Sequence, residues 1–157
     1  MSVEPVSYIQ SNSKTQVAES LREVLANTYV LYFKTHSYHW NVEGSLFKPA
    51  HELFEEQYTE MWEAMDALAE RLRALDVYAP INTEDMTKSA SLAPATGTPD
   101  AISMVKELAE DNTKTAGTIL RAIEVAQESG DEVTTDMLIG RATIHEKNAW
   151  MLRATAK

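Results

Sequence analysis

The stretch PAHELFEEQYTEMWEAMDALAERLRAL, residues 49–75, decides the fold. Apolar side chains recur in it at steps of three and four residues, the spacing that places them on one face of an α-helix. These side chains are Phe54, Tyr58, Met61, Met65, Leu68, Leu72 and Leu75. The pattern predicts one long helix that packs in a bundle through this face, with Tyr58 in the core.

A second stripe of the same helix combines an imidazole, carboxylates and an indole. It consists of His51, Glu55, Trp62, Asp66 and Glu70. In an ideal helix Glu55 and Asp66 point the same way to within about 20°. The His51/Glu55 pair and the Asp66/Glu70 pair are nevertheless roughly 15–20 Å apart along the axis. One copy of the helix therefore cannot bring both pairs to a single metal centre.

Two copies of the helix can do so if they pack antiparallel across a two-fold axis. Position i then lies opposite position 121 − i of the other copy, so that His51 faces Glu70 and Glu55 faces Asp66. Two-fold symmetry produces isologous contacts of this kind, in which the same patch is used by both subunits. We therefore expect a metal site that is shared between subunits and formed twice in each dimer.

The composition limits the class of protein. The 157 residues fit one domain, and 44% hydrophobic with 24% charged residues is ordinary for a globular chain. Helix formers dominate over the five Gly and five Pro, which predicts an all-α fold. The chain has no Cys, which excludes disulfides, thiolate catalysis and sulfur-ligated zinc or iron–sulfur clusters.

Charge and hydropathy bear on partners and location. The formal charge of −10 argues against a protein that binds nucleic acid over its whole surface, and it suits a protein that attracts cations. No apolar run approaches 18 residues, and the N-terminal segment lacks the features of a signal peptide. We therefore expect no membrane association and a cytoplasmic location, with association with the nucleoid as a further option.

Periodicity and turn residues divide the chain into a tail and one domain. We expect a flexible tail over residues 1–14 and a single four-helix-bundle domain over residues 15–157. Ser13 and Gln16 resemble a capping box for a first helix that runs to about Asn41, with His39 on its inward face. A short turn at 41–48 leads to the helix of residues 49–75.

The second half of the chain predicts two more helices after a long connection. Residues 76–98 are too long for a structureless loop, which favours a short extra helix at 83–90. Thr98 followed by Pro99 predicts the start of a third helix that ends at Ser129. Asp131 can cap a fourth helix that ends near Ala154. The expected architecture is four long helices with a crossover between the second and third.

The candidate ligands offer nitrogen and oxygen without sulfur, a set that suits iron or zinc. They are His39, His51, Glu55, Asp66 and Glu70. A carboxylate-rich site favours Fe(II) oxidation because anionic oxygens stabilise the ferric product. The alternative is that these residues bind no metal, since a His and a Glu four residues apart on a helix are usually a solvent-exposed pair. The two-fold relationship and the inward His39 favour the metal site. No His has a Glu three residues before it, so a ferritin site inside the bundle is unsupported.

Several motifs carry a resemblance to a known family. They are Tyr38-His39-Trp40-Asn41-Val42-x-Gly44, Phe47-x-x-x-His51-x-x-x-Glu55, Asp66-x-x-x-Glu70, Gly130-Asp131-Glu132-x-Thr134-x-Asp136 and His145-Glu146-Lys147-x-x-Trp150-Met151-Leu152. From about residue 15 onward the chain resembles the Dps family of mini-ferritins, and the ligand spacing is highly specific.

The resemblance implies a ferritin-like bundle, a dodecameric hollow shell and a ferroxidase. Iron would enter as Fe(II), be oxidised at dimer interfaces chiefly by hydrogen peroxide, and be stored as ferric mineral. By matching position, His39, His51 and Glu55 would come from one subunit, and Asp66 and Glu70 from its neighbour. The family usually has Asp where this chain has Glu55, which keeps the carboxylate but changes its reach.

Four other residues have both a functional and a structural interpretation. Trp40 and Trp62 are either interface packing residues or, by the resemblance, sacrificial electron donors. Asp131 and Asp136 match acidic residues that line iron-entry pores in related shells. Helix capping by Asp131 and favourable first-turn charge at Asp136 are the structural alternatives. His36 and His145 are interpreted as solvated or structural.

Many Dps relatives bind DNA through a tail rich in Lys and Arg, and this chain differs from them. Its first 15 residues hold a single base, Lys14, and the bases of the C-terminal segment are sparse: Arg141, Lys147, Arg153 and Lys157. We expect weak or no DNA binding at physiological salt. The competing hypotheses are a nucleoid protein that binds DNA structurally and a helical interaction module without metal.

Overall fold

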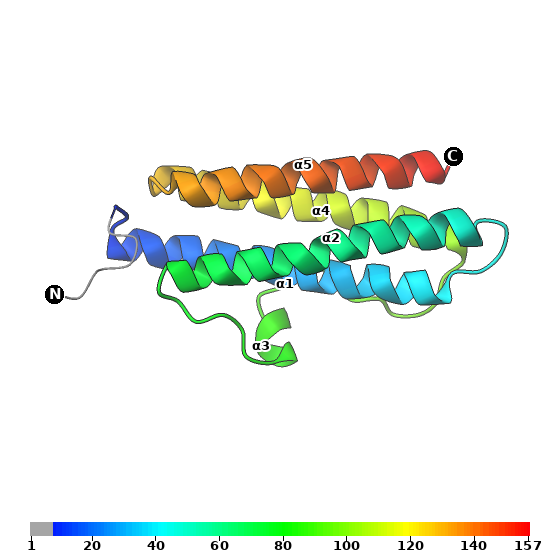
Figure 1. The fold of residues 1–157 in the computed structure, drawn as a ribbon, viewed down its shortest axis with the longest axis horizontal. Helices are drawn as coiled ribbons and strands as arrows, with labels where there is room; N and C mark the ends of the chain where they lie inside the picture. Colours follow the sequence, from blue (N-terminus) through cyan, green and yellow to red (C-terminus); the bar gives the residue numbers. More distant parts are fainter. Residues whose placement is uncertain (1–7) are drawn as a thin grey trace.

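The structure is a computed structural model that describes residues 8–157. Four long helices form a bundle, and a fifth, short helix lies outside it (Figure 1). The helices are α1 (Ser11–Asn41), α2 (Phe47–Ala74), α3 (Thr83–Thr87), α4 (Ala101–Glu128) and α5 (Glu132–Thr155). No strand occurs in residues 8–157. The all-α prediction and the extra helix in the crossover are confirmed.

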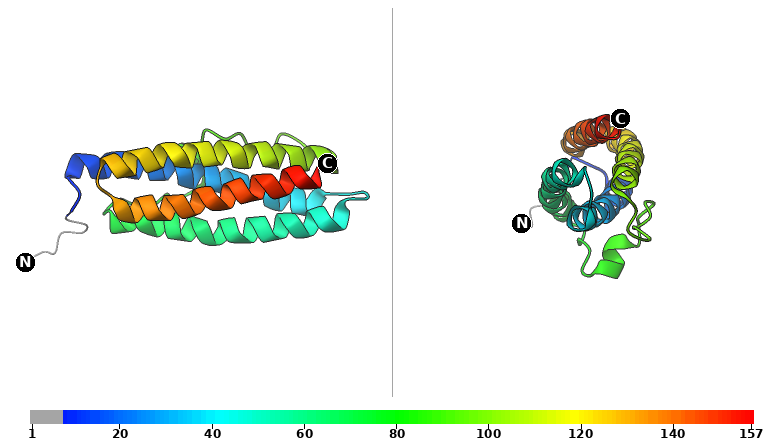
Figure 2. Two further views of the ribbon diagram at one scale, coloured as in Figure 1. Left: turned by 90° about the horizontal axis from the view of Figure 1, so that it is seen from above. Right: turned by 90° about the vertical axis from the view of Figure 1, so that its right-hand side faces the viewer.

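The bundle consists of two antiparallel pairs, α1 with α2 and α4 with α5. Because α2 and α4 run in the same direction, the connection between them must travel back along the whole bundle (Figure 1). Viewed along the axis, the four long helices surround a common centre, and α3 lies beside α1 on the outside (Figure 2). None of the helices in the described part of the chain has the length and apolar character needed to cross a bilayer.

The crossover is fixed to α1 by one buried amide. Asn27 is 2% exposed, and its Oδ1 accepts hydrogen bonds from the backbone N–H groups of Ser91 and Leu92 at 2.9 and 3.0 Å. Its Nδ2 donates to Oγ of Ser91 at 2.9 Å. The side chain of Leu92 is buried. These contacts satisfy backbone groups that a loop would otherwise leave unpaired against the bundle.

The core of the bundle consists of two apolar clusters. One contains Leu21, Leu25, Leu68, Leu72, Ile119 and Leu138, and the other contains Leu31, Tyr38, Phe54, Met61, Met104, Leu108 and Leu152. On α4 and α5, the positions between the two clusters hold the fully buried polar residues Asn112 and His145. The imidazole of His145 donates from Nδ1 to Asn112 Oδ1 at 2.9 Å and accepts at Nε2 from Arg141 at 3.0 Å.

Two predicted helix starts are wrong by two or three residues. α1 begins at Ser11 after Gln10, whose side chain makes no capping bond, so Ser13 does not open the helix. Ile9 is buried in the core and draws the helix start earlier, so residues 11–14 of the expected tail are helical. Residues 1–7 of that tail lie outside the described residues. α4 is capped by Asp100 rather than Thr98, because Oδ1 of Asp100 accepts from the N–H of Ser103 at 2.9 Å.

Candidate metal centre

Two histidines meet where α1 ends and α2 begins. The turn between the helices contains Gly44 at φ +92°, a conformation that favours glycine. It brings the rings of His39 and His51 into a stack with centroids 3.7 Å apart and planes 15° apart. Nδ1 of His39 donates to the carbonyl oxygen of His51, and Nδ1 of His51 donates to the carbonyl oxygen of His39, both at 2.7 Å.

This reciprocal pairing fixes the tautomer of both rings. A carbonyl oxygen can only accept, so the hydrogen of each neutral imidazole is on Nδ1. The lone pair of each ring is then on Nε2, where it is available to a metal ion. Metal-ligating histidines are commonly held in this way, with the other ring nitrogen donating to a carbonyl or a carboxylate. The arrangement fits the expected ligand role of His39 and His51.

The three candidate carboxylates belong to the exposed face of α2. Glu55 lies one turn beyond His51, while Asp66 and Glu70 lie much further along the helix, about 22 and 28 Å from His51 by the helical rise. Within residues 8–157 of one chain, no three His, Asp or Glu side chains gather closely enough to hold a metal ion. One chain thus brings together the two histidines, with Glu55 one turn from His51, and leaves Asp66 and Glu70 far from them.

An aromatic cluster surrounds the histidine pair. His36 stacks on Tyr58 with centroids 3.8 Å apart, and the ring of Trp40 lies 4.1 Å from that of His36. Trp40 and Trp62 are 58% and 62% exposed on the outer face of α1 and α2. The prediction that Tyr58 is a core residue is wrong. Its ring is only half-buried, because it turns toward His36 instead of the bundle axis.

His36 is neither fully solvated nor buried. Desolvation lowers its pKa from 6.5, and the neighbouring His39 lowers it further, while Glu55 opposes both effects. These effects together favour the neutral form of the imidazole.

A buried ion pair that sequence analysis did not identify holds this end of α1 against α4. Lys34 is 3% exposed, and its Nζ lies 3.0 Å from Oε1 of Glu107 and 2.6 Å from Oδ2 of Asp111. The hydroxyl of Tyr38 donates to Oε2 of Glu107 at 2.6 Å. Burial, followed by this hydrogen bond, raises the pKa of Tyr38. The available signal was the position of Lys34, between the inward residues Leu31 and Tyr38.

The two aspartates near the start of α5 have different environments. Asp131 is fully buried, and its Oδ1 accepts from Nη2 of Arg71 at 2.8 Å and from the N–H of Thr134 at 2.9 Å. It is the predicted helix cap, and within one chain its carboxylate is enclosed by these partners. Asp136 is exposed and lines a groove of about 430 Å³ that also contains Glu132.

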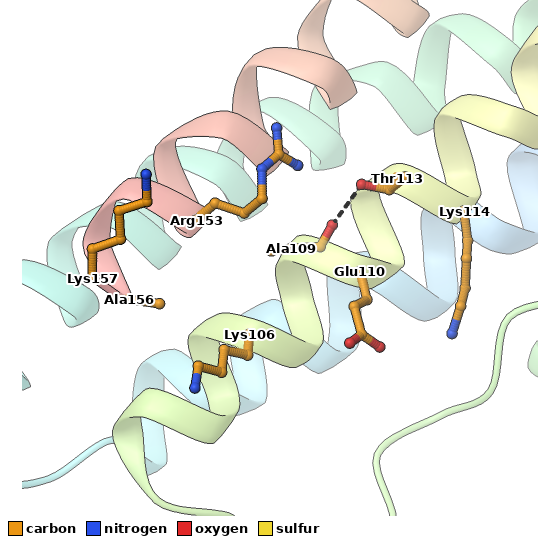
Figure 3. A pocket seen from close by; sticks show the side chains of 8 residues that line it. All are labelled: Lys106, Ala109, Glu110, Thr113, Lys114, Arg153, Ala156 and Lys157. Atoms are coloured by element: carbon orange, nitrogen blue, oxygen red, sulfur yellow. Dashed lines mark hydrogen bonds between the residues drawn. The ribbon is translucent and has the colours of Figure 1, made fainter.

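A groove between α4 and the C-terminal end of α5 carries several basic side chains. Its volume is about 580 Å³, and Figure 3 shows the basic side chains at its margins. Lys106 and Lys114 come from α4, Arg153 and Lys157 come from the C-terminal end of the chain, and Glu110 is the one carboxylate in the lining. We name these five residues the basic groove.

The family model for the ferritin-like domain matches residues 18–157. The "DNA protection during starvation protein" of Brevibacillus brevis is 40% identical over 138 residues, which cover 88% of this chain and 93% of the relative. This chain belongs to the Dps family. "General stress protein 20U" of Bacillus subtilis is 38% identical over 139 residues, covering 88% of this chain and 96% of the relative.

Solved structures place this Dps chain within the same fold. A Dps protein from Bacillus brevis superposes with a TM-score of 0.90 at 37% identity, covering 95% of this chain and all of the other. A Dps protein from Vibrio cholerae O1 superposes with a TM-score of 0.91 at 29% identity over the full length of both. The Vibrio protein is described as a member of a broad superfamily of ferritin-like diiron-carboxylate proteins.

Proposed function

We propose that this protein is a ferroxidase and iron-storage subunit that oxidises Fe(II) with hydrogen peroxide. The observation that carries the proposal is the His39/His51 pair, in which both Nε2 lone pairs are left available to a metal. The diiron-carboxylate description of the Vibrio cholerae relative supports iron as the metal. The assembly that fits the family is a hollow homo-oligomeric shell, a dodecamer built from two-fold dimers, with ferric mineral inside.

Completion of the site requires a second copy of the chain. Glu55 lies one helical turn from His51 in the same chain. Asp66 and Glu70 instead reach the histidines of a neighbouring chain when two α2 helices pack antiparallel. The surface that would be covered carries exposed Trp40 and Trp62. Large aromatic rings are typical of such contacts. Interface packing by these indoles is therefore the simplest role for them, and it is compatible with electron donation.

The proposed reaction balances without any further reagent. Two Fe(II) ions each give up one electron, and one hydrogen peroxide takes up both electrons with two protons and leaves as two waters. Glu55, Asp66 and Glu70 contribute negative charge, which favours Fe(III) over Fe(II). The formal charge of −10 draws cations toward the particle, and Asp136, which is exposed, is the more accessible candidate for an acidic iron-entry path.

Structural DNA binding is the second candidate, and the basic groove favours it. Its four cations and one carboxylate give it a local charge of +3 on an acidic chain. Relatives carry the name "DNA protection during starvation protein". We infer that protection by this chain is chemical: removing Fe(II) and peroxide together prevents hydroxyl-radical formation near DNA in the cytoplasm. Four cations per chain support only weak binding at physiological salt.

Subunit mixing tests the shared site. His51→Ala and Asp66→Ala homodimers should each oxidise Fe(II) slowly while remaining assembled. Verified heterodimers of the two variants should recover activity, because one of their two sites keeps every ligand. Unchanged kinetics in the single variants would exclude these ligands, and no recovery in heterodimers would exclude sharing. A wild-type protein that shows no Fe(II)-dependent loss of peroxide would instead favour the metal-free interaction module.

A further inference from the structure

Polar side chains lie between α2 and α5 near the middle of the bundle, where the two helices run side by side in opposite directions (Figure 2). We name Gln57 and Glu60 of α2 and Arg141 and Asn148 of α5 the polar seam. Gln57, Arg141 and Asn148 are 3%, 6% and 7% exposed, and the side chain of Glu60 is 34% exposed. The polar seam is therefore almost entirely inside the protein, and Glu60 is its one partly exposed member.

Helix geometry arranges these four side chains in one row. Nη1 of Arg141 donates to Oε2 of Glu60 and so joins the two helices. Gln57 lies one turn before Glu60, and Asn148 lies two turns after Arg141. Because α2 and α5 are antiparallel, both steps lead from the Arg141–Glu60 contact toward the same end of the bundle. By the helical rise, Gln57 and Asn148 are about 4.5 and 10.5 Å along the axis from that contact.

Five buried atoms of the polar seam have no hydrogen-bond partner within the described part of the chain. They are Oε1 and Nε2 of Gln57, Oε1 of Glu60, Nε of Arg141 and Nδ2 of Asn148. Buried polar atoms in native proteins nearly always have a partner, because an unpaired one loses its hydration without compensation. Five such atoms along one row therefore indicate that the polar seam holds a ligand.

The unpartnered atoms and their charge define the chemistry of that ligand. The two oxygens need a hydrogen-bond donor, and the three nitrogens need an acceptor. The polar seam has no net charge, because the guanidinium of Arg141 is paired with the carboxylate of Glu60. A metal ion would be repelled by Arg141, and an anion would be repelled by the unpartnered oxygen of Glu60. Either ion would also add a buried charge without a partner, so a neutral ligand is favoured.

We propose that the polar seam binds small neutral molecules that both donate and accept hydrogen bonds, the chemistry that water and hydrogen peroxide share. Bound molecules of this kind bridge groups that protein atoms do not reach and connect α2 to α5. Glu60 gives them access from solvent. The site is separate from the candidate metal centre, because Gln57 lies two residues after Glu55 and therefore on nearly the opposite side of α2. The inference does not depend on the proposed ferroxidase function.

The experiment combines crystallography with urea unfolding of the assembled protein. Gln57→Leu and Asn148→Leu each remove the polar atoms at nearly unchanged side-chain size, and Gln127→Leu is the matched control at an exposed position of α4. High-resolution maps show whether density lies within hydrogen-bond distance of the polar seam. Iron-free crystals are measured before and after a brief soak in hydrogen peroxide. Urea midpoints of all four proteins are compared at one subunit concentration.

We expect density beside Gln57 and Asn148 in the wild type and loss of at least one peak in each seam variant. The urea midpoint should fall in both seam variants and stay unchanged in Gln127→Leu, because leucine cannot bind the bridging molecule.

The result that contradicts the proposal has the opposite sign. If the polar seam holds nothing, its unpaired amides cost stability, and leucine should raise the urea midpoint. Empty wild-type density, or density with the geometry of a metal ion or an oxyanion, would overturn the inference whatever the variants do. Of the two occupants that fit, peaks unchanged by the soak identify water, and their replacement by pairs of bonded oxygens identifies hydrogen peroxide.

Discussion

His39 and His51 orient each other through their backbones: Nδ1 of each ring donates to the carbonyl oxygen of the other residue at 2.7 Å. The two rings stack at 3.7 Å, so that neither can rotate without losing both a hydrogen bond and a ring contact. The pair therefore enters metal binding already ordered, and less conformational entropy is lost when an ion binds. A substitution of one histidine should therefore also affect how the other ring is held.

We predict that His39→Gln and His51→Gln are coupled in Fe(II) binding. Each single change removes one nitrogen ligand and one face of the stack, so each should weaken binding by at least the roughly 10–100-fold that residues orienting a ligand typically contribute. The double variant should lose less than the sum of the two losses in free energy. Anaerobic calorimetric titration of the assembled protein measures the cycle, and strictly additive losses would show that the rings act independently.

The sequence was sufficient to predict the histidines but not their pairing. Periodicity placed His39 on the inward face of the first helix and His51 on the metal-ligand stripe of the second. Their mutual hydrogen bonds depend on how a short turn with Gly44 at positive φ brings two helix ends together. Helical periodicity contains no information about that approach, and the same limitation explains why Tyr58 was misplaced.

The capping residue could be predicted for α5 but not for α1 or α4. Asp131 follows Gly130 and caps α5 as expected, because Gly130 adopts φ +71° and ends the preceding helix. The burial of Asp131 was not predictable, since it depends on Arg71, sixty residues away in the chain. Local sequence therefore identified the cap, while the ion pair with a distant guanidinium could not be predicted from it.

We predict that Asp131→Ala unfolds the protein more easily, whereas Asp136→Asn acts on iron entry. Removing the buried partner of Arg71 should lower the free energy of unfolding by about 3–5 kcal/mol, because the guanidinium is left unpaired at 8% exposure. Asp136 is exposed, so its change should alter stability by no more than about 0.5 kcal/mol. Urea unfolding measures the first effect.

Stopped-flow measurement of Fe(II) oxidation tests the effect of Asp136→Asn on iron entry. If Asp136 lies on the entry path, Asp136→Asn should slow oxidation at low Fe(II) and have less effect at saturating Fe(II), because attraction of the ion governs only the first regime. An unchanged rate at low Fe(II) would remove Asp136 from the path. A stable Asp131→Ala protein would show that the Arg71 pair contributes little.

DNA binding should be weak and steeply dependent on salt. With four cations in the basic groove, the slope of log K against log salt should not exceed about 3.6 per chain engaged, from roughly 0.9 per phosphate contact. An electrophoretic shift at low salt should vanish by about 150 mM. Arg153→Ala with Lys157→Ala should reduce the slope, and Lys14→Ala is the matched control outside the groove. Tight binding above that salt concentration would favour the structural DNA-binding hypothesis.

His145 should make the protein less stable as the pH falls below neutrality. Burial lowers the pKa of this imidazole from 6.5 to about 3, and the charge of Arg141 acts in the same direction. Its two neighbours explain the effect: Nδ1 already donates to Asn112, and a hydrogen added at Nε2 would point at the guanidinium of Arg141. The folded state therefore keeps a neutral ring.

The direction of the pH effect on stability follows from which state, folded or unfolded, binds a proton at His145. Below pH 6.5 the unfolded chain takes up a proton at His145 that the folded chain refuses, so stability is lost as the pH falls toward 3. The loss should be about 1.4 kcal/mol for each pH unit, or roughly 2 kcal/mol at pH 5. His145→Gln should be less stable at pH 7.5, because it loses buried hydrogen bonds, but should lack this component of the pH dependence. Urea unfolding at fixed subunit concentration between pH 7.5 and 5 gives the slope of the unfolding free energy against pH for the wild type and for His145→Gln. Equal slopes would contradict the assignment of this pH dependence to His145.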